Sequence, residues 1–196
     1  VSGRNLVVTD VIVRYVIRTL QRDLELLKEA GREAFDILGR EIRVKGDFHG
    51  LKLKGFIDRL DSFAADQARV VDYKTGKVLD DDVDIHDGNA EAIAESIFAP
   101  DIKDRPKIAF QFFIYDYLVS RHPLTAGKNI CNCVYSTSKI FREAPVTVGL
   151  NRKFYDAVSG HLEKMIDEMC DPEVGFRRTQ DDKICGFCDF RTICGR

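Results

Sequence analysis

The sequence lacks a long apolar run. Its richest stretch, residues 7–17, is interrupted by Asp10 and Arg14, and no segment approaches the ~20 apolar residues that a membrane-spanning helix needs. No signal peptide is visible, so we expect a cytoplasmic protein with no membrane partner. Because the chain opens at Val1 without an initiator Met, we also expect it to be a piece of a longer polypeptide.

An excess of either charge is also missing. Thirty Lys and Arg face 32 Asp and Glu, for a net charge of -2. This balance excludes a chain that coats nucleic acid through bulk positive charge, although it leaves room for a local basic groove. With 44% hydrophobic and 32% charged residues, the composition is that of a folded chain rather than a disordered one. Its length allows one domain with a small appendage.

The six cysteines do not form the pattern of a disulfide framework. Cys185, Cys188 and Cys194 crowd the end of the chain. In a cytoplasmic protein, such a cluster indicates metal or iron–sulfur ligation before it indicates disulfides. No two of the four histidines have metal-ligand spacing, so we assign no role to any of them.

Periodicity predicts an α/β fold. Helical spacing marks residues 10–29, closed by Gly31, then 107–121 as an amphipathic helix, and 151–169. Strands are expected at 41–44, 51–60, 69–74, 129–136 and 146–148, with turns at 47–50 and 64–68. The acidic segment 79–105 is expected to be a surface excursion or a mobile flap. This order predicts a mixed central sheet, a three-stranded meander plus further strands, flanked by helices.

Two of the expected strands carry carboxylates, Asp58 in Gly-Phe-Ile-Asp-Arg and Asp72 in Val-Val-Asp-Tyr-Lys-Thr. Alternation places Asp72 and Lys74 on one face, and a hairpin of this length can set Asp58 beside Asp72. Paired carboxylates favour a divalent cation, and an ammonium stabilises charge that develops on a phosphodiester. The pattern therefore indicates metal-assisted phosphodiester hydrolysis. The alternative is an exposed face with surface ion pairs of little energetic value.

The helix that follows adds two polar groups. Gln111 and Tyr115 lie four residues apart and so share one helical face. Tyr115 alone would be an ordinary core aromatic residue. Gln111, however, lies in an apolar stretch, and a buried amide needs polar partners.

Residues 55–59, 72–76 and 111–115, in this order and at these separations, resemble the PD-(D/E)XK nuclease superfamily. The match is to its RecB-like branch, found in AddB and RecB subunits and in CRISPR-associated RecB-like nucleases, and it extends from about residue 41 to the C-terminus. The resemblance implies a restriction-endonuclease-like core in which Asp58, Asp72 and the main-chain carbonyl of Tyr73 hold Mg²⁺ or Mn²⁺. Lys74 would orient the attacking water. Gln111 and Tyr115 would support the site or touch the nucleic-acid backbone.

The cysteine spacing C-x2-C-x5-C at the end of the chain resembles the iron–sulfur staple of AddB-like proteins. This implies a nuclease core over residues 1–175 and a tail over 176–196 whose Cys185, Cys188 and Cys194 bind a 4Fe–4S cluster. A zinc knuckle is the chemical alternative, because three thiolates need a fourth ligand. In the family, the fourth cysteine and a metal-binding histidine lie upstream of the core. Neither residue type occurs upstream here, because the first cysteine of this sequence is Cys131 and the first histidine is His49. Both absences are expected if the sequence is a piece of a longer polypeptide.

Several other residues have ordinary structural interpretations. Cys170 is a possible fourth thiolate, but a thiol packed at a helix end is favoured. Cys131 and Cys133 are expected to pack in the core. Glu41 can approach a metal from the neighbouring strand, although a solvated glutamate at a strand end is favoured. The acidic run 80–82 is expected in a solvated loop that opposes DNA binding nearby.

The sequence thus predicts a metal-dependent DNA nuclease domain, specifically an exonuclease acting on single strands in a RecB/AddB-like repair or recombination protein. A helicase subunit, or the helicase-like remainder of the same chain, would feed it DNA. Two alternatives stay open. One is a catalytically silent nuclease-like domain that binds DNA or a partner, against which the complete set of Asp58, Asp72 and Lys74 argues. The other is a zinc-ribbon interaction module formed by the cysteines of the tail.

Overall fold

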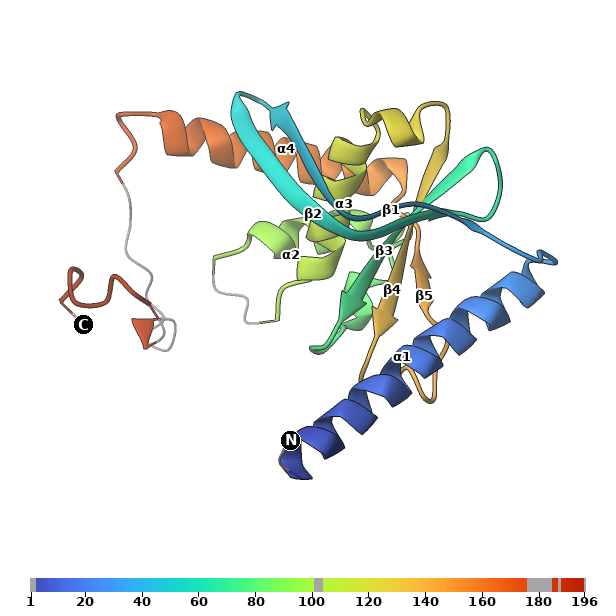
Figure 1. Cartoon of the computed structure of the whole chain (residues 1–196). Helices are drawn as coiled ribbons and strands as arrows, with labels where there is room; N and C mark the ends of the chain where they lie inside the picture. Colours follow the sequence, from blue (N-terminus) through green and yellow to red (C-terminus); the bar gives the residue numbers. More distant parts are fainter. Residues whose placement is uncertain (1–2, 101–103, 176–184, 187, 196) are drawn as a thin grey trace.

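The computed structural model describes residues 3–100, 104–175, 185–186 and 188–195. Its centre is a five-stranded sheet in the order β1-β2-β3-β4-β5 (Figure 1). The first three strands form an antiparallel meander, β4 joins β3 in parallel, and β5 is antiparallel to β4. The strands are β1 (Asp36–Phe48), β2 (Leu51–Ser62), β3 (Gln67–Lys74), β4 (Asn129–Ser136) and β5 (Val146–Val148). The prediction of a mixed sheet flanked by helices is confirmed.

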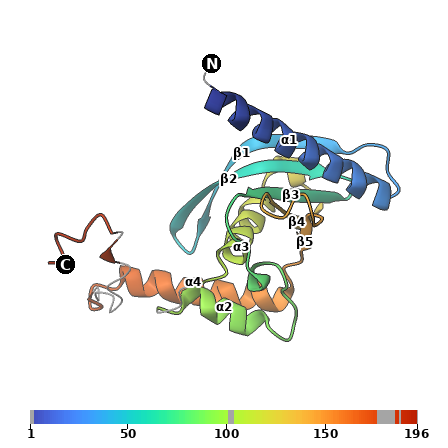
Figure 2. The ribbon, with the colours of Figure 1, turned by 90° about the horizontal axis from the view of Figure 1, so that it is seen from below.

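The helices lie in layers on the two faces of the sheet. Figure 2 shows α1 (Gly3–Glu29) along one face and α3 (Lys107–Val119) against the other. Beyond α3 lies a further layer of α2 (Ala90–Phe98) and α4 (Arg152–Cys170). Two apolar clusters fill the space between these layers, one between the sheet and α3 and the other among α2, α3 and α4.

The β1–β2 hairpin is longer than the sequence predicts. Its two-residue turn, His49–Gly50, has positive φ at both positions, 49° and 79°, and such a turn matches the twist of paired strands. The expected turn at 47–50 is therefore confirmed. The first strand, however, spans 13 residues instead of the predicted 41–44. Its charged residues break the apolar alternation because much of this ribbon faces solvent on both sides.

The helix α3 differs in character from the prediction. The sequence predicts an amphipathic helix over 107–121, but α3 is buried on two sides because it lies between the sheet and the α2–α4 layer. Phe112 and Leu118 face the sheet cluster, whereas Ala109 and Phe113 face the outer cluster. A helix covered on both sides needs apolar residues all round.

The acidic segment is also part of the core. Its expected form, a surface excursion or mobile flap, is wrong for the described residues 79–100, which form a 3-10 turn at Asp80–Asp82 and the helix α2. Helix α2 buries Ala90, Ile93 and Ala94 against α4. The two acidic residues of α2, Glu91 and Glu95, are exposed.

The helix α4 begins where Asn151 caps it by accepting a hydrogen bond from the Phe154 N–H at 2.8 Å. Its predicted apolar stripe is correct at four positions, which are Phe154, Val158, Leu162 and Ile166. Met165 and Met169, predicted on the same stripe, are exposed. Cys170 is exposed as well, so its interpretation as a packed thiol is wrong, whereas the expected burial of Cys133 is confirmed.

The helix α1 is anchored mainly through its C-terminal half. Arg22, Asp23 and Leu27 are buried there, and the helix ends before Gly31, whose φ of 63° is readily adopted by glycine. Large apolar side chains are exposed along most of its length, with ten of them between 46 and 65% exposed: Leu6, Val7, Val8, Val11, Ile12, Val13, Val16, Ile17, Leu20 and Leu24.

Candidate active site

The candidate site lies where two neighbouring strands separate. β2 and β3 are paired only from Asp61–Arg69 to Arg59–Val71. One further step of this register sets Asp58 opposite Asp72. Beyond that point β2 continues with β1 to the hairpin and leaves β3. The two carboxylates that the sequence singles out therefore lie at the fork between the strands.

The side chain of Asp58 links β2 to β3 just beyond their last paired residues. Its Oδ2 accepts the main-chain N–H of Tyr73 at 2.9 Å. No other hydrogen bond to this carboxylate comes from the residues that the structure describes, so Oδ1 remains available to a ligand. The same contact fixes the main chain of Tyr73, whose carbonyl is expected to bind metal.

Asp72 and Lys74 form a compact group with Gln111 of α3. The Lys74 ammonium lies 2.7 Å from Asp72 Oδ2 and donates to Gln111 Oε1 at 2.6 Å. The Gln111 amide in turn donates to Asp72 Oδ1 at 3.1 Å. Each of the three side chains thus contacts the other two, which gives the polar residue in this apolar helix the partners that its burial requires.

Tyr115 connects this group to β2. Its hydroxyl accepts a hydrogen bond from the Gln111 amide at 2.7 Å and donates one to the Phe56 carbonyl at 2.7 Å. The ring packs so closely on Gly55 that a Cβ at that position would lie 2.8 Å from Tyr115 Cε1. The glycine in Gly-Phe-Ile-Asp-Arg therefore has a packing role that the sequence alone does not reveal.

The electrostatics of the site favour a bound cation. Burial raises the pKa of Asp72, and the nearby Asp58 charge raises it further, while Lys74 and Gln111 act in the opposite direction. Asp72 is only 3% exposed, and its Oδ2 makes no well-aligned hydrogen bond despite the nearby ammonium. Two carboxylates and a main-chain carbonyl are the hard oxygen ligands that Mg²⁺ and Mn²⁺ prefer. The donor set therefore fits such an ion.

Among the described residues, the fold does not place a third carboxylate with Asp58 and Asp72 to form a metal-binding group. Within the described ranges, no three His, Cys, Asp or Glu side chains are grouped so that they could hold a metal ion. Glu41 lies opposite Asp58, between the pairs Arg40–Arg59 and Ile42–Ile57. The two acids line one open depression of about 890 Å³. Glu41 is in the middle of β1 with a φ of 49°, so its expected place at a strand end is wrong.

The opposite face of the sheet holds a buried ionic network that sequence analysis missed. Arg59 follows Asp58 and therefore points to the α1 side, where it binds both carboxylate oxygens of Asp23 at 2.8 Å. Asp61 pairs with Arg59 at 2.9 Å and with Arg69 at 2.8 Å. The network ties α1 to the strand that carries Asp58. No periodic signal in the sequence connects residues this far apart.

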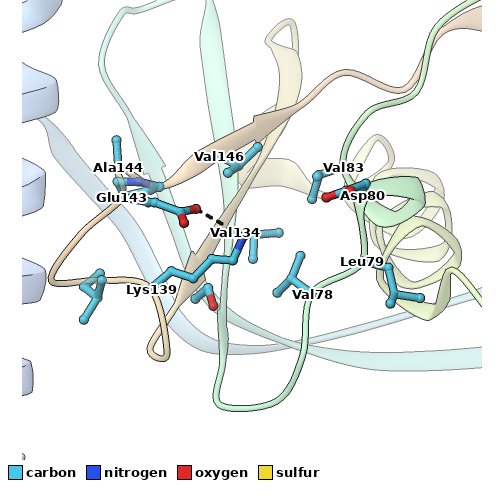
Figure 3. Close-up of a pocket in the computed structure, with 12 residues that line it drawn as sticks. Val78, Leu79, Asp80, Val83, Val134, Lys139, Glu143, Ala144 and Val146 are labelled. Atoms are coloured by element: carbon cyan, nitrogen blue, oxygen red, sulfur yellow. Dashed lines mark ion pairs between the residues drawn. The ribbon is translucent and has the colours of Figure 1, made fainter. Parts of the chain in front are cut away.

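A separate small cavity lies between the loop after β3 and the segment before β5 (Figure 3). It has a volume of about 30 Å³, mostly apolar walls that include Val78 and Val134, and an ion pair of 3.2 Å between Lys139 and Glu143 beside it. None of the five predicted site residues lines it. A space of this size holds only about one or two water molecules.

The cysteine-rich tail is described only in part. Residues 176–184, 187 and 196 lie outside the described residues, so the predicted boundary at 175/176 is not tested. Cys185 is buried, whereas Cys188 and Cys194 are exposed. In the described part of the chain these thiols do not form a metal-binding group. The iron–sulfur staple therefore stays a prediction.

The mixed sheet, its helical layers and the polar group at the strand fork define a restriction-endonuclease-like α/β protein. A family model of the PD-(D/E)XK nuclease superfamily matches residues 7–195, and the chain belongs to this superfamily. No curated protein matches the sequence. None of the helices in the described part of the chain is long and apolar enough to cross a bilayer.

Proposed function

We propose that this chain is the nuclease domain of a RecB/AddB-like DNA repair or recombination protein and acts as an Mg²⁺- or Mn²⁺-dependent exonuclease on single-stranded DNA. Membership of the PD-(D/E)XK nuclease superfamily supports nuclease chemistry. The observation that carries the proposal is the meeting of Asp58, Asp72, Lys74 and Gln111 at the strand fork. Three separate parts of the sequence supply these side chains.

The metal would be held by Asp58, Asp72 and the main-chain carbonyl of Tyr73. Such an ion lowers the pKa of bound water and neutralises charge on the phosphate. Asp58 Oδ2 is occupied by the Tyr73 N–H, which leaves Oδ1 to face the ion. Asp72 contributes Oδ2, which has no well-aligned hydrogen bond.

Lys74 would act on the attacking water and on the phosphate. An ammonium has three N–H donors. One of them is donated to Gln111 Oε1 at 2.6 Å, and the ammonium also forms an ion pair with Asp72 at 2.7 Å. A remaining N–H can orient water or stabilise charge on a phosphate oxygen. In this arrangement Gln111 and Tyr115 are positioning residues, because they act by holding Lys74 in place.

The test is cleavage of end-labelled single-stranded DNA in Mg²⁺ or Mn²⁺, with the intact parent chain where one exists. We expect Asp72→Ala and Lys74→Ala each to lower the cleavage rate by at least about 10²-fold, as loss of a charge-stabilising group does. Lys139→Ala removes an ammonium of the same type from an exposed surface pair and should leave the rate unchanged. Wild-type rates in both site variants would refute the assignment.

A catalytically silent domain is the second candidate, and the lack of a third carboxylate among the described residues favours it. The two candidates differ in metal affinity. Calorimetric titration with Mn²⁺ should show binding that Asp58→Ala abolishes if the chain is an enzyme. A wild-type chain that binds DNA but no Mn²⁺ would instead favour the silent domain.

We also infer that residues 176–196 form a separate tail in which Cys185, Cys188 and Cys194 bind a 4Fe–4S cluster with a fourth thiolate from elsewhere in the parent chain. The spacing of the three cysteines supports this. A cluster absorbs visible light, so the parent chain purified without oxygen should be coloured. A colourless preparation that contains stoichiometric zinc would favour the zinc knuckle.

A further inference from the structure

A basic cleft adjoins the candidate active site. It is an open depression of about 410 Å³ between the loop that follows β3 and the beginning of α3. At one end it is lined by Lys74 and Gln111, which belong to the site already described. The other end is lined by Lys77, Arg105 and Lys107, to which neither the sequence analysis nor the proposed function assigns a role.

The charge of this cleft is opposite to that of the whole chain. Four cationic side chains line it and two carboxylates, Asp82 and Asp104, do so as well, which leaves an excess of two positive charges. The chain as a whole carries -2. Asp82 is buried and engaged, because it accepts the main-chain N–H groups of Leu79 at 3.0 Å and Ile108 at 2.8 Å. It fixes the beginning of α3 against the loop and so shapes the cleft.

The cations at the outer end have no anionic partner within the part of the chain that the structure describes. Lys77 and Lys107 are exposed and take part in none of its ion pairs. Arg105 donates to the carbonyl oxygens of Ala99 at 2.6 Å and Pro100 at 2.9 Å. These acceptors are neutral, so the guanidinium keeps its charge. Its side chain also lines the cleft, so the positive charge of the guanidinium is close to an anion bound there.

We propose that Lys77, Arg105 and Lys107 form a subsite for the backbone phosphate that neighbours the one held at Asp58, Asp72 and Lys74. This inference rests on the proposed nuclease function. It adds the place where the DNA strand would continue beyond the cleaved bond. The lining of the cleft supports it, because Lys74 and these three cations border one depression, so a strand seated there would contact them together.

The same cleft predicts binding that does not depend on base sequence. No aromatic side chain is among the described residues that line it, so it offers no stacking platform for bases. Cationic contacts to phosphates position a strand without reading its sequence. Binding would therefore depend on charge. Because it releases counterions from the DNA, the affinity should fall steeply as the salt concentration rises.

The test is fluorescence anisotropy of the intact chain with a labelled oligo-dT strand in EDTA, where no cleavage occurs, across a series of salt concentrations. We compare Lys77→Ala/Lys107→Ala with Lys52→Ala/Lys54→Ala, which removes two exposed ammonium groups from the β1–β2 ribbon. We expect the cleft pair to weaken binding at least about tenfold at low salt and to reduce the salt slope by about 1 for each lysine. The ribbon pair should bind as the wild type does.

Three results would overturn the inference. They are a wild-type chain that binds no strand, equal weakening by the two pairs, and an affinity for oligo-dA that differs tenfold or more from that for oligo-dT. Failure of the proposed function gives a different result. If the wild type binds DNA through Lys77 and Lys107 but does not cleave it in Mg²⁺ or Mn²⁺, only the nuclease assignment is contradicted. If the wild type cleaves DNA and Lys77→Ala/Lys107→Ala binds DNA as the wild type does, only the subsite is contradicted.

Discussion

Arg59 and Asp23 form a buried bidentate pair, with both nitrogen–oxygen distances at 2.8 Å. One residue belongs to β2 and the other to α1, so the pair clamps the first helix to the strand that carries Asp58. Both side chains are at most 8% exposed. Removing one partner leaves the other charge buried without compensation, and this is where most of the energetic cost arises.

We expect Asp23→Ala to lower the free energy of unfolding by about 3 kcal/mol or more, the usual cost of breaking a buried pair. Urea denaturation followed by circular dichroism measures it. Asp156→Ala breaks a pair on α4 whose side chains are 89% and 64% exposed and should cost less than about 0.5 kcal/mol. Equal losses in the two variants would show that the clamp contributes little.

The affinity for Mn²⁺ should depend on Asp58 and not on Glu41, which lies opposite it on β1. Asp58→Asn keeps an oxygen that can accept the Tyr73 N–H but removes the charge, so the fork should persist while Mn²⁺ binding weakens at least about tenfold. Glu41→Gln removes the same charge from the same depression and serves as the control. Isothermal titration calorimetry compares the two. A matching loss in Glu41→Gln would mean that general charge, rather than ligation, attracts the ion.

The close contact between Gly55 and Tyr115 predicts sensitivity to a single methyl group. Gly55→Ala places a Cβ 2.8 Å from the ring, and we expect it to cost about 1–3 kcal/mol, as overpacking does. It should also lower cleavage by displacing Tyr115 from Gln111. Gly76→Ala is the matched control, because a Cβ there meets nothing within 4 Å. Thermal unfolding and cleavage rates are measured for both.

A pH effect on stability is expected from Asp116. Burial raises its pKa to about 6, and hydrogen bonds from Tyr155 and Asn132 only partly offset this. The folded chain therefore binds this proton more tightly than the unfolded chain does. The resulting stabilisation is fully present below about pH 4 and is lost as the pH rises through 6.

Asp116→Asn removes the titrating group and nearly keeps the shape. We expect the stability of the wild type relative to this variant to fall by roughly 2 kcal/mol between pH 4 and pH 7.5. Taking the difference cancels the other carboxylates of the chain. Urea unfolding at several pH values provides the curve, and a flat difference would contradict the raised pKa of Asp116.

Local patterns predicted the regular elements well where the environment is uniform. The bounds of β4 and β5 agree with the predicted 129–136 and 146–148, and α4 begins one residue after its cap at Asn151. Alternation and capping are local signals, so a single sequence carries them. Asp58 and Asp72 also lie close together at the fork, as alternation and the hairpin predicted, whereas the place of Gln111 beside Asp72 was implied only by the family resemblance.

The predictions from sequence that were wrong, or missing, concern contacts between residues far apart in the chain. The charges of segment 79–105 suggested a loop, but Ala90, Ile93 and Ala94 bury one face of α2 against a helix some 60 residues later in the chain. In the same way, Lys77 and Lys107 are separated by this acidic segment in the sequence, and only the tertiary fold brings them to one cleft. Periodicity carries no information about such pairings.

The fork at Asp58 also makes alignment errors during folding costly. Neighbouring residues of a strand face opposite sides, so a slip of β2 by one position against β3 would exchange the roles of Asp58 and Arg59. A guanidinium would then occupy the place intended for a metal ligand, and a carboxylate would be forced against Asp23 on the other side. Repulsion between the carboxylates of Asp58 and Asp23 on the α1 side would disfavour the slipped pairing, so the charges of these two neighbouring residues also help to select the register of β2.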